Sequence, residues 1–140
     1  MVASVPLSVV TPQRSLYEGP VEFLVCRGAD GELGVLPRHA PLITYLKAGL
    51  VMIRNQGVEE LLFVAGGFLE IQPDRVTILA DVAERAEEID TQRAAEARRR
   101  AEQQLSGKVS KEDVMELEAA LERSLARIRV AELRRQRNRA

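Results

Sequence analysis

The sequence divides near Glu84 into two segments of different composition. All five aromatic residues, all six prolines and eight of the nine glycines lie before that point, whereas the remainder is rich in Ala, Arg, Glu and Leu. Glycine and proline mark turns and aromatic residues favour strands, whereas Ala, Arg, Glu and Leu are strong helix formers. The chain is therefore expected to be all-β in its first part and all-α in its second.

Charge divides at the same place. Residues 1–84 carry 6 basic and 10 acidic residues, and residues 85–140 carry 14 basic and 11 acidic residues, which together give a net charge of −1. A near-neutral chain argues against a polycation that coats nucleic acid. The most basic stretch, residues 134–139, has no interleaved aromatic residues for base stacking. It is interpreted as a solvated helix end, an anionic-lipid patch or a partner for an acidic protein surface, and nucleic acid is the least favoured partner.

Short apolar runs separated by turn residues fill the first segment. Representative runs are residues 21–26, 49–54, 60–64 and 75–80. Many short strands at close spacing indicate a β-sandwich or a barrel. Gly66 and Gly67 interrupt an apolar run and predict a bulge or a sharp bend, and Pro6 suggests that the first strand lies at an edge.

The second segment has the apolar spacing of two helices. Asp90 is the expected N-cap of the first helix, and Ser110 that of a second helix of about 28 residues. The apolar positions recur at intervals of three and four: Ala94, Ala97, Ala101 and Leu105, then Val114, Leu117, Leu121, Leu125 and Ile128. An Ala-rich hairpin cannot build its own core, so it must pack on the first segment or on another protein. A movable arm and a permanently docked hairpin both fit this pattern.

The residues for several kinds of chemistry are missing. One Cys and one His exclude an internal disulfide and argue against a Cys/His zinc site or a catalytic triad, and Cys26 is expected to be a buried apolar residue. No Walker A motif is present. No apolar run approaches the roughly 20 residues that span a bilayer, and the first residues lack the pattern of a signal peptide. The cytoplasm is the expected compartment.

Five motifs together resemble the epsilon subunit of bacterial and chloroplast F-type ATP synthases. The motifs lie in the order and at the spacing of that family and cover almost the whole chain. They are GELGVLPRHAPLIT at 31–44, FVAGGFLEIQP at 63–73, VTILAD at 76–81, IDTQRA at 89–94 and VAEL at 130–133.

The resemblance implies a fold and a function. The fold is an N-terminal β-sandwich of about ten strands in two sheets over residues 1–86, followed by an antiparallel helical hairpin over 87–140. The function is that of a non-catalytic rotor subunit at the cytoplasmic face of the bacterial plasma membrane, held there peripherally by the complex. The sandwich would bind the gamma subunit and the polar loops of the c-ring. The hairpin would either fold back or extend between the alpha and beta subunits, where it inhibits ATP hydrolysis.

The resemblance also assigns roles to residues. Glu32, Arg38 and His39 lie in the motif that contacts the c-ring and gamma, although ordinary turn polarity also explains them. No cofactor is required, but a regulatory ATP site is implied for Glu84, Ile89, Asp90, Arg93, Ala94, Arg100, Arg123 and Arg127. Two pairs of arginines would hold the phosphates. The alternative is a capping aspartate followed by solvated arginines.

Two other functions remain open from the sequence. One is a stand-alone module that binds an adenine nucleotide as a sensor. The other is a stand-alone β-sandwich protein with a coiled-coil arm, which would form an oligomer by itself.

Overall fold

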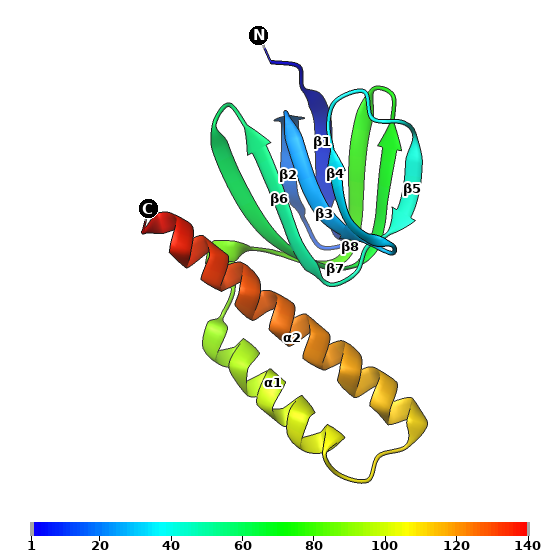
Figure 1. The fold of residues 1–140 in the computed structure, drawn as a ribbon, viewed down its shortest axis with the longest axis vertical. Coiled ribbons are helices and arrows are strands. Elements are labelled where there is room, and N and C mark those ends of the chain that lie inside the picture. The colour runs from blue at the N-terminus through cyan, green and yellow to red at the C-terminus, as the bar shows by residue number, and fades with distance from the viewer. Residues whose placement is uncertain (1, 140) are drawn as a thin grey trace.

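The computed structural model describes residues 2–139, with a strand-rich part followed by two helices (Figure 1). A short 3₁₀ turn, η1 (Ala86–Glu88), joins the two parts. The helices are α1 (Thr91–Leu105) and α2 (Lys111–Asn138). The strands are β1 (Val5–Val10), β2 (Ser15–Val21), β3 (Phe23–Gly28), β4 (Gly31–Val35), β5 (Leu42–Tyr45), β6 (Gly49–Asn55), β7 (Val58–Gln72) and β8 (Arg75–Arg85).

The strands form one hydrogen-bonded sheet that folds over into a sandwich. Their order is β2-β1-β8-β7-β6-β3-β4, and β5 pairs separately with β7. The expected sandwich followed by a helical hairpin is confirmed, and only the strand count differs slightly. Residues 2–139 have eight strands rather than about ten, because β7 and β8 are 15 and 11 residues long and run through the sandwich as single strands. The N-terminal part of β7 pairs with β6 and its C-terminal part with β5.

Gly66 and Gly67 lie where β7 changes partner. Pairing with β6 ends at Val64 and pairing with β5 begins at Phe68, while the register with β8 continues unbroken. Both glycines have positive φ angles, 73° and 101°. A side chain on Gly67 would collide with the carbonyl oxygen of Leu79 on β8. The predicted irregularity is therefore a bend, and glycine is required because β8 passes too close for any side chain.

The prediction that Pro6 marks an edge strand is wrong. β1 lies between β2 and β8. Pro6 faces Pro20 on β2, and the ladder between β1 and β8 begins one residue later, at Leu7. Neither neighbour therefore requires the amide that proline lacks.

Apolar side chains from both layers fill the sandwich. Its largest fully buried members include Leu7, Leu24, Ile53, Leu69 and Ile78. Cys26 belongs to this core, as expected, and burial raises the pKa of its thiol to about 11. This thiol is a packing group, because a thiol that stays protonated at neutral pH is a poor nucleophile.

The helices begin at the predicted caps. The Asp90 side chain accepts a hydrogen bond from the Arg93 amide at 3.1 Å, and Ser110 does so from the Asp113 amide at 3.2 Å. The predicted length of α2 is also confirmed at 28 residues. The two helices pack through small residues, among them Ala94, Ala101 and Ser124, so the hairpin buries little apolar area.

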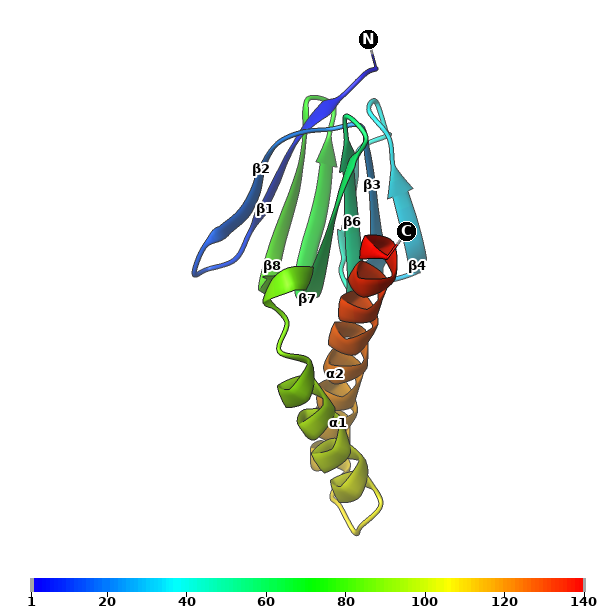
Figure 2. The same cartoon turned by 90° about the vertical axis from the view of Figure 1, so that its left-hand side faces the viewer.

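A second apolar cluster joins the C-terminal half of α2 to the sandwich. Val130 and Ala131 of α2 pack on the outer face of β6 and β7, where Met52, Leu61 and Phe63 lie. Ala86 and Ile89 of the connecting segment close the cluster. Figures 1 and 2 both show this end of α2 beside the strands, while the tip of the hairpin points away from them. The predicted stripe of α2 is only partly covered, because Leu125 remains 41% exposed.

The bend in β7 generates a stability prediction. Replacing Gly67 with Ala should lower the free energy of unfolding by about 2–5 kcal/mol, because an unfavourable backbone conformation adds to a steric clash. Gly57→Ala is the matched control, since Gly57 also has a positive φ angle (77°) but faces open space. Urea unfolding of both variants measures the difference, and equal losses would contradict the role given to β8.

Candidate functional site

The 3₁₀ turn between sandwich and hairpin is fixed by Glu88. Two guanidinium nitrogens of Arg14, on the β1–β2 turn, lie 2.8 and 2.9 Å from its carboxylate oxygens. The Arg85 amide also donates to Glu88 at 2.9 Å. These bonds, led by that from Arg14, lower the pKa of Glu88 to about 2. These bonds therefore hold η1 on the sandwich, and they do not extend to the residues after Glu88.

Glu84 and Arg127 form the least exposed ion pair between the sandwich and α2. Their side chains meet at 2.5 Å, and each is 27% exposed. The Arg127 guanidinium also lies 4.5 Å from the ring centroid of Phe63, which is directly opposite Glu84 across the β7–β8 ladder. Arg127 thus binds a carboxylate and an aromatic face at once. Glu84 and Arg127, which are both predicted to bind ATP, thus contact each other through their side chains.

Three other residues predicted to bind ATP have structural roles. Ile89 packs in the second apolar cluster, and Ala94 is buried in the hairpin. The Asp90 carboxylate caps α1. These positions hold the connecting segment and the start of α1 in place.

The remaining three predicted residues are arginines that have no carboxylate partner among residues 2–139. Arg93 and Arg100 lie two turns apart on α1 and are exposed, and Arg123 on α2 is half-buried. Their side chains make no ion pair or hydrogen bond within residues 2–139. These guanidiniums are available to an anion.

The predicted rotor-contact residues occupy two places along β4. Glu32 lies near its start, opposite Arg27 of β3, and lines the cleft that Glu122 and Leu125 of α2 also line. The β3–β4 turn is at the end of the sandwich nearer the helices (Figure 1). Arg38 and His39 lie in the turn beyond its end, where Arg38 has a φ angle of 70° and the His39 amide donates to the Leu36 carbonyl at 3.1 Å. The structure therefore does not gather the three residues into one cluster.

Two clefts lie between α2 and the sandwich. One, of about 300 Å³, is lined by residues that include Glu59, Arg85 and Arg137. The other, of about 420 Å³, has Val25, Leu50 and Leu125 among its apolar residues and Arg27 and Glu122 at a 3.3 Å ion pair. Neither cleft includes a residue predicted to bind ATP.

Sequence reasoning missed an exposed apolar row on the sandwich. Tyr45, Phe68 and Leu79 are directly opposite one another on β5, β7 and β8, and the two rings lie 4.6 Å apart. All three are exposed, Tyr45 by 65%, and Ile43 is exposed beside them. The signal in the sequence was that Leu42 and Leu46 fall on one face of this strand and Ile43 and Tyr45 on the other, so one apolar face had to lie outside the core.

Both parts of the chain match known protein families. Residues 4–86 match the family described as ATP synthase, Delta/Epsilon chain, beta-sandwich domain, and residues 87–132 match its long alpha-helix domain. The chain belongs to the ATP synthase delta/epsilon chain family. The resemblance found in the sequence motifs is confirmed.

Individual members of the family are similar along most of their length. The ATP synthase epsilon chain of Desulforamulus reducens is 46% identical over 126 residues, which is 90% of this chain and 96% of that one. The epsilon chain of Pelotomaculum thermopropionicum is 54% identical over 102 residues, covering 73% and 76%. Among solved structures, a chain of the Euglena gracilis mitochondrial ATP synthase, in a structure of OSCP, F1 and c-ring, superposes with a TM-score of 0.79 at 26% identity, covering 89% and 79%.

No helix within residues 2–139 is both long and apolar enough to cross a membrane. The same part of the chain has no group of three or more His, Cys, Asp or Glu side chains arranged to hold a metal ion.

The Glu88 contacts generate a pH prediction. Because the pKa of Glu88 is lower in the folded protein than its ordinary value of 4.5, its contacts stabilise the fold above pH 4.5 and cease to do so as the pH falls to about 2. Glu88→Gln should therefore lose less stability than the natural chain over this interval. Urea unfolding at several pH values measures this. Glu96→Gln, at an exposed α1 residue without an ion pair in residues 2–139, should keep the natural profile, and identical profiles for all three proteins would contradict the prediction.

Proposed function

We propose that the chain is a non-catalytic rotor subunit of a proton-transporting F-type ATP synthase. In this proposal residues 1–86 couple c-ring rotation to the gamma subunit, and residues 87–140 inhibit ATP hydrolysis when they extend. The observation that carries it is the contrast between two faces of the sandwich. One face exposes an apolar row that no other part of residues 2–139 covers, and the other holds α2 through one apolar cluster.

The exposed apolar row supports attachment to gamma. Tyr45, Phe68 and Leu79 form a continuous apolar surface on three neighbouring strands. Contiguous exposed apolar surface on a soluble domain is typical of a protein interface. A rigid sandwich suits this role because it must transmit torque without changing shape.

The polar loops of the c-ring are proposed to contact the turn after β4. Arg38 and His39 present basic and polar groups beside the exposed Leu36 at the end of the sandwich farther from the helices (Figure 1). Glu32 lies at the other end of β4, in the cleft beside α2, and its proposed contact rests on the resemblance of its motif alone. The subunit would thereby be peripheral at the cytoplasmic face of the bacterial membrane.

The small contact of α2 supports a movable arm. The hairpin is bound to the sandwich through few apolar side chains, of which Val130 is the largest that is fully buried on α2. A docked state of modest free energy can exchange with an extended one, and a partner that binds only the extended state shifts the population. The alpha and beta subunits are the proposed partners of the extended arm.

A pair of variants tests the division of roles. Deleting residues after Ile89 should leave binding to gamma intact and raise the ATPase activity of the assembled complex, because the inhibitory helices are gone. Phe68→Asp should instead abolish or strongly weaken binding to gamma, because it places a charge in the apolar interface. Co-purification with gamma and steady-state ATP hydrolysis provide the measurements.

Val58→Asp is the control for the second variant, since Val58 is also an exposed apolar strand residue but lies at the β6–β7 turn. It should bind gamma normally. Loss of gamma binding on truncation, or unchanged ATPase activity in the truncated complex, would contradict the assigned roles.

A second function, regulation by ATP, is favoured by the arginines without partners. Arg93, Arg100 and Arg123 offer forked donors that suit phosphate oxygens. They belong to both helices, so a bound nucleotide would stabilise the folded hairpin. Glu84 and Arg127 already bind each other, so ATP would have to exchange with that ion pair or bind beside it.

Titration of the full chain with millimolar ATP tests this function. ATP should raise the melting temperature of the natural chain. Arg93→Ala or Arg123→Ala should each weaken ATP binding by about 1.5–3 kcal/mol, and so reduce this rise, because a charged phosphate donor is lost. Arg98→Ala is the control, since Arg98 is an exposed α1 residue that pairs with Glu102 at 2.8 Å. A melting temperature that ATP leaves unchanged would exclude regulation by direct binding.

A further inference from the structure

A polar row runs beside the exposed apolar row on the same face of the sheet. Glu70 on β7, Thr77 on β8 and Ser8 on β1 are directly opposite one another. Glu18 on β2 is opposite Ser8 and accepts a hydrogen bond from its hydroxyl. Glu70 and Thr77 each lie two residues along the strand from a member of the apolar row, so the two rows are about 7 Å apart. Half-buried Val10 extends the apolar row onto β1, beside Glu18. The carboxylates of Glu18 and Glu70 therefore border the apolar row on one side.

Asp81 borders the apolar row on its other side. It is exposed and lies on β8 two residues beyond Leu79, in the direction away from Thr77. A side chain on Gly66, at the bend in β7, would collide with the Asp81 carboxylate. Because Gly66 has no Cβ, this carboxylate can lie against the backbone of β7, which limits where it can move.

These three residues, Glu18, Glu70 and Asp81, are called the border carboxylates. None of them forms an ion pair within residues 2–139. Arg75 of β8 shares a hollow of about 490 Å³ with Glu18 and Glu70, but its Nε donates to the Gln72 side chain at 2.6 Å. The border is therefore negative at neutral pH, because Arg75 offsets only one of the three carboxylates.

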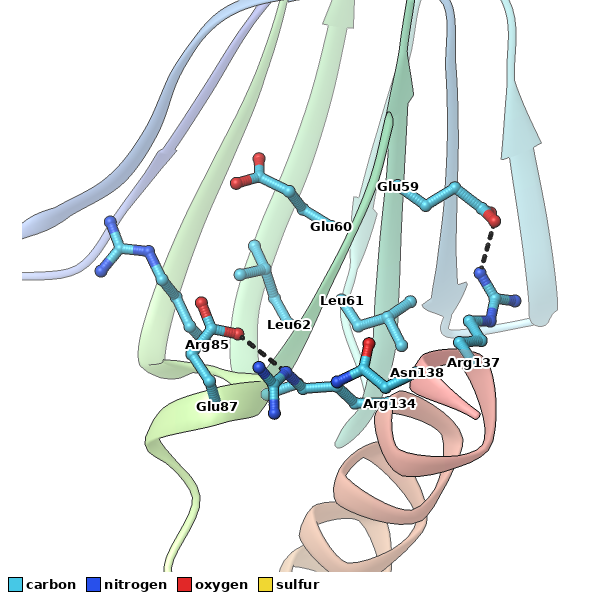
Figure 3. Close-up of a pocket in the computed structure, with 10 residues that line it drawn as sticks. Glu59, Glu60, Leu61, Leu62, Arg85, Glu87, Arg134, Arg137 and Asn138 are labelled. Carbon is cyan, nitrogen blue, oxygen red and sulfur yellow. Dashed lines mark ion pairs between the residues drawn. The ribbon is translucent and has the colours of Figure 1, made fainter. Parts of the chain in front are cut away.

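The apolar cluster under α2 shows how this sandwich compensates carboxylates beside a covered apolar surface. Glu59 and Glu87 lie next to that cluster, and α2 supplies Arg137 and Arg134 to them at 2.7 and 3.6 Å (Figure 3). The helix that covers apolar residues there also brings cations for the neighbouring carboxylates. The same requirement applies to whatever covers the exposed apolar row.

A partner that buries the apolar row also covers the border carboxylates. A helix is about 10–12 Å across with its side chains, which is more than the separation of the rows. Removing a carboxylate from water opposes binding unless a cation or a hydrogen-bond donor replaces the lost water. Because residues 2–139 pair none of the border carboxylates with a cation, the partner must supply one.

We propose that the sandwich selects its partner by charge as well as by apolar area, and that the partner surface has Lys or Arg side chains on both sides of an apolar centre. This inference rests on the proposed attachment to gamma and adds the chemistry of the gamma surface that binds. The border carboxylates attract that basic surface during encounter and pair with it in the complex. A surface with acidic borders is rejected by repulsion between like charges.

The test measures how fast the full chain binds immobilised gamma by surface plasmon resonance, between about 0.05 and 0.5 M NaCl. The natural chain should associate more slowly as the salt concentration rises. The triple variant Glu18→Gln, Glu70→Gln, Asp81→Asn should associate about tenfold more slowly than the natural chain at low salt, because the long-range attraction is lost. The difference between the two proteins should disappear at high salt, where the attraction is screened.

A charge-reversed variant separates charge from local damage. With Glu18→Lys, Glu70→Lys and Asp81→Lys, association should be slower still at low salt and should become faster as NaCl is raised, because salt then screens a repulsion. A folding defect would not reverse the direction of the salt dependence.

The matched control changes the net charge by the same amount on another part of the chain. Glu96, Glu116 and Glu118 are exposed hairpin residues that form no ion pair within residues 2–139. Their replacement by Gln should leave the association rate and its salt dependence close to those of the natural chain.

The outcomes distinguish this inference from the proposed function. If the natural chain binds gamma and the triple variant binds with the same rate and the same salt dependence, the charge border is overturned and attachment to gamma stands. An equal loss of rate in the hairpin control would also overturn it, because the effect would then come from net charge alone. If the natural chain does not bind gamma, attachment to gamma and the charge border are both overturned.

Discussion

The contact between the C-terminal half of α2 and the outer face of β6 and β7 determines where the helical hairpin lies. The sandwich has its own core and needs no helix to complete it, whereas the Ala-rich hairpin has too little apolar area to fold stably alone. The hairpin therefore depends on one small contact. A change in that contact alters the position of the helices without altering the sandwich.

The connection between the two parts limits where such a change can occur. Arg14 and Arg85 attach Glu88 to the sandwich, so η1 belongs with the strands. Ile89 packs against the same cluster as Val130. In the proposed release of α2, Ile89 would become exposed and the Glu88 contacts would remain, so the pivot would lie in the short segment before α1.

Charge and apolar area have different roles on the two outer faces. The row formed by Tyr45, Phe68 and Leu79 is apolar and suits a lasting interface, because salt does not screen the burial of apolar area as it screens ion pairs. The contact under α2 combines one cluster of apolar side chains with ion pairs, whose strength depends on solvent and on competing charges. A rotor subunit needs both kinds of contact, one to transmit torque and one to be exchanged.

Local signals in the sequence determined the all-β and all-α segments, the caps Asp90 and Ser110 and the bend at Gly66 and Gly67. Each of these depends on a residue and its immediate neighbours in the chain. The motifs also determined the family. Strand number was not predictable, because whether a 15-residue strand counts once or twice depends on its partners. The role of Arg127 and Arg137 was decided only by the tertiary structure. Their carboxylates, Glu84 and Glu59, lie 43 and 78 residues away in sequence, and only the folded sheet brings them to one face.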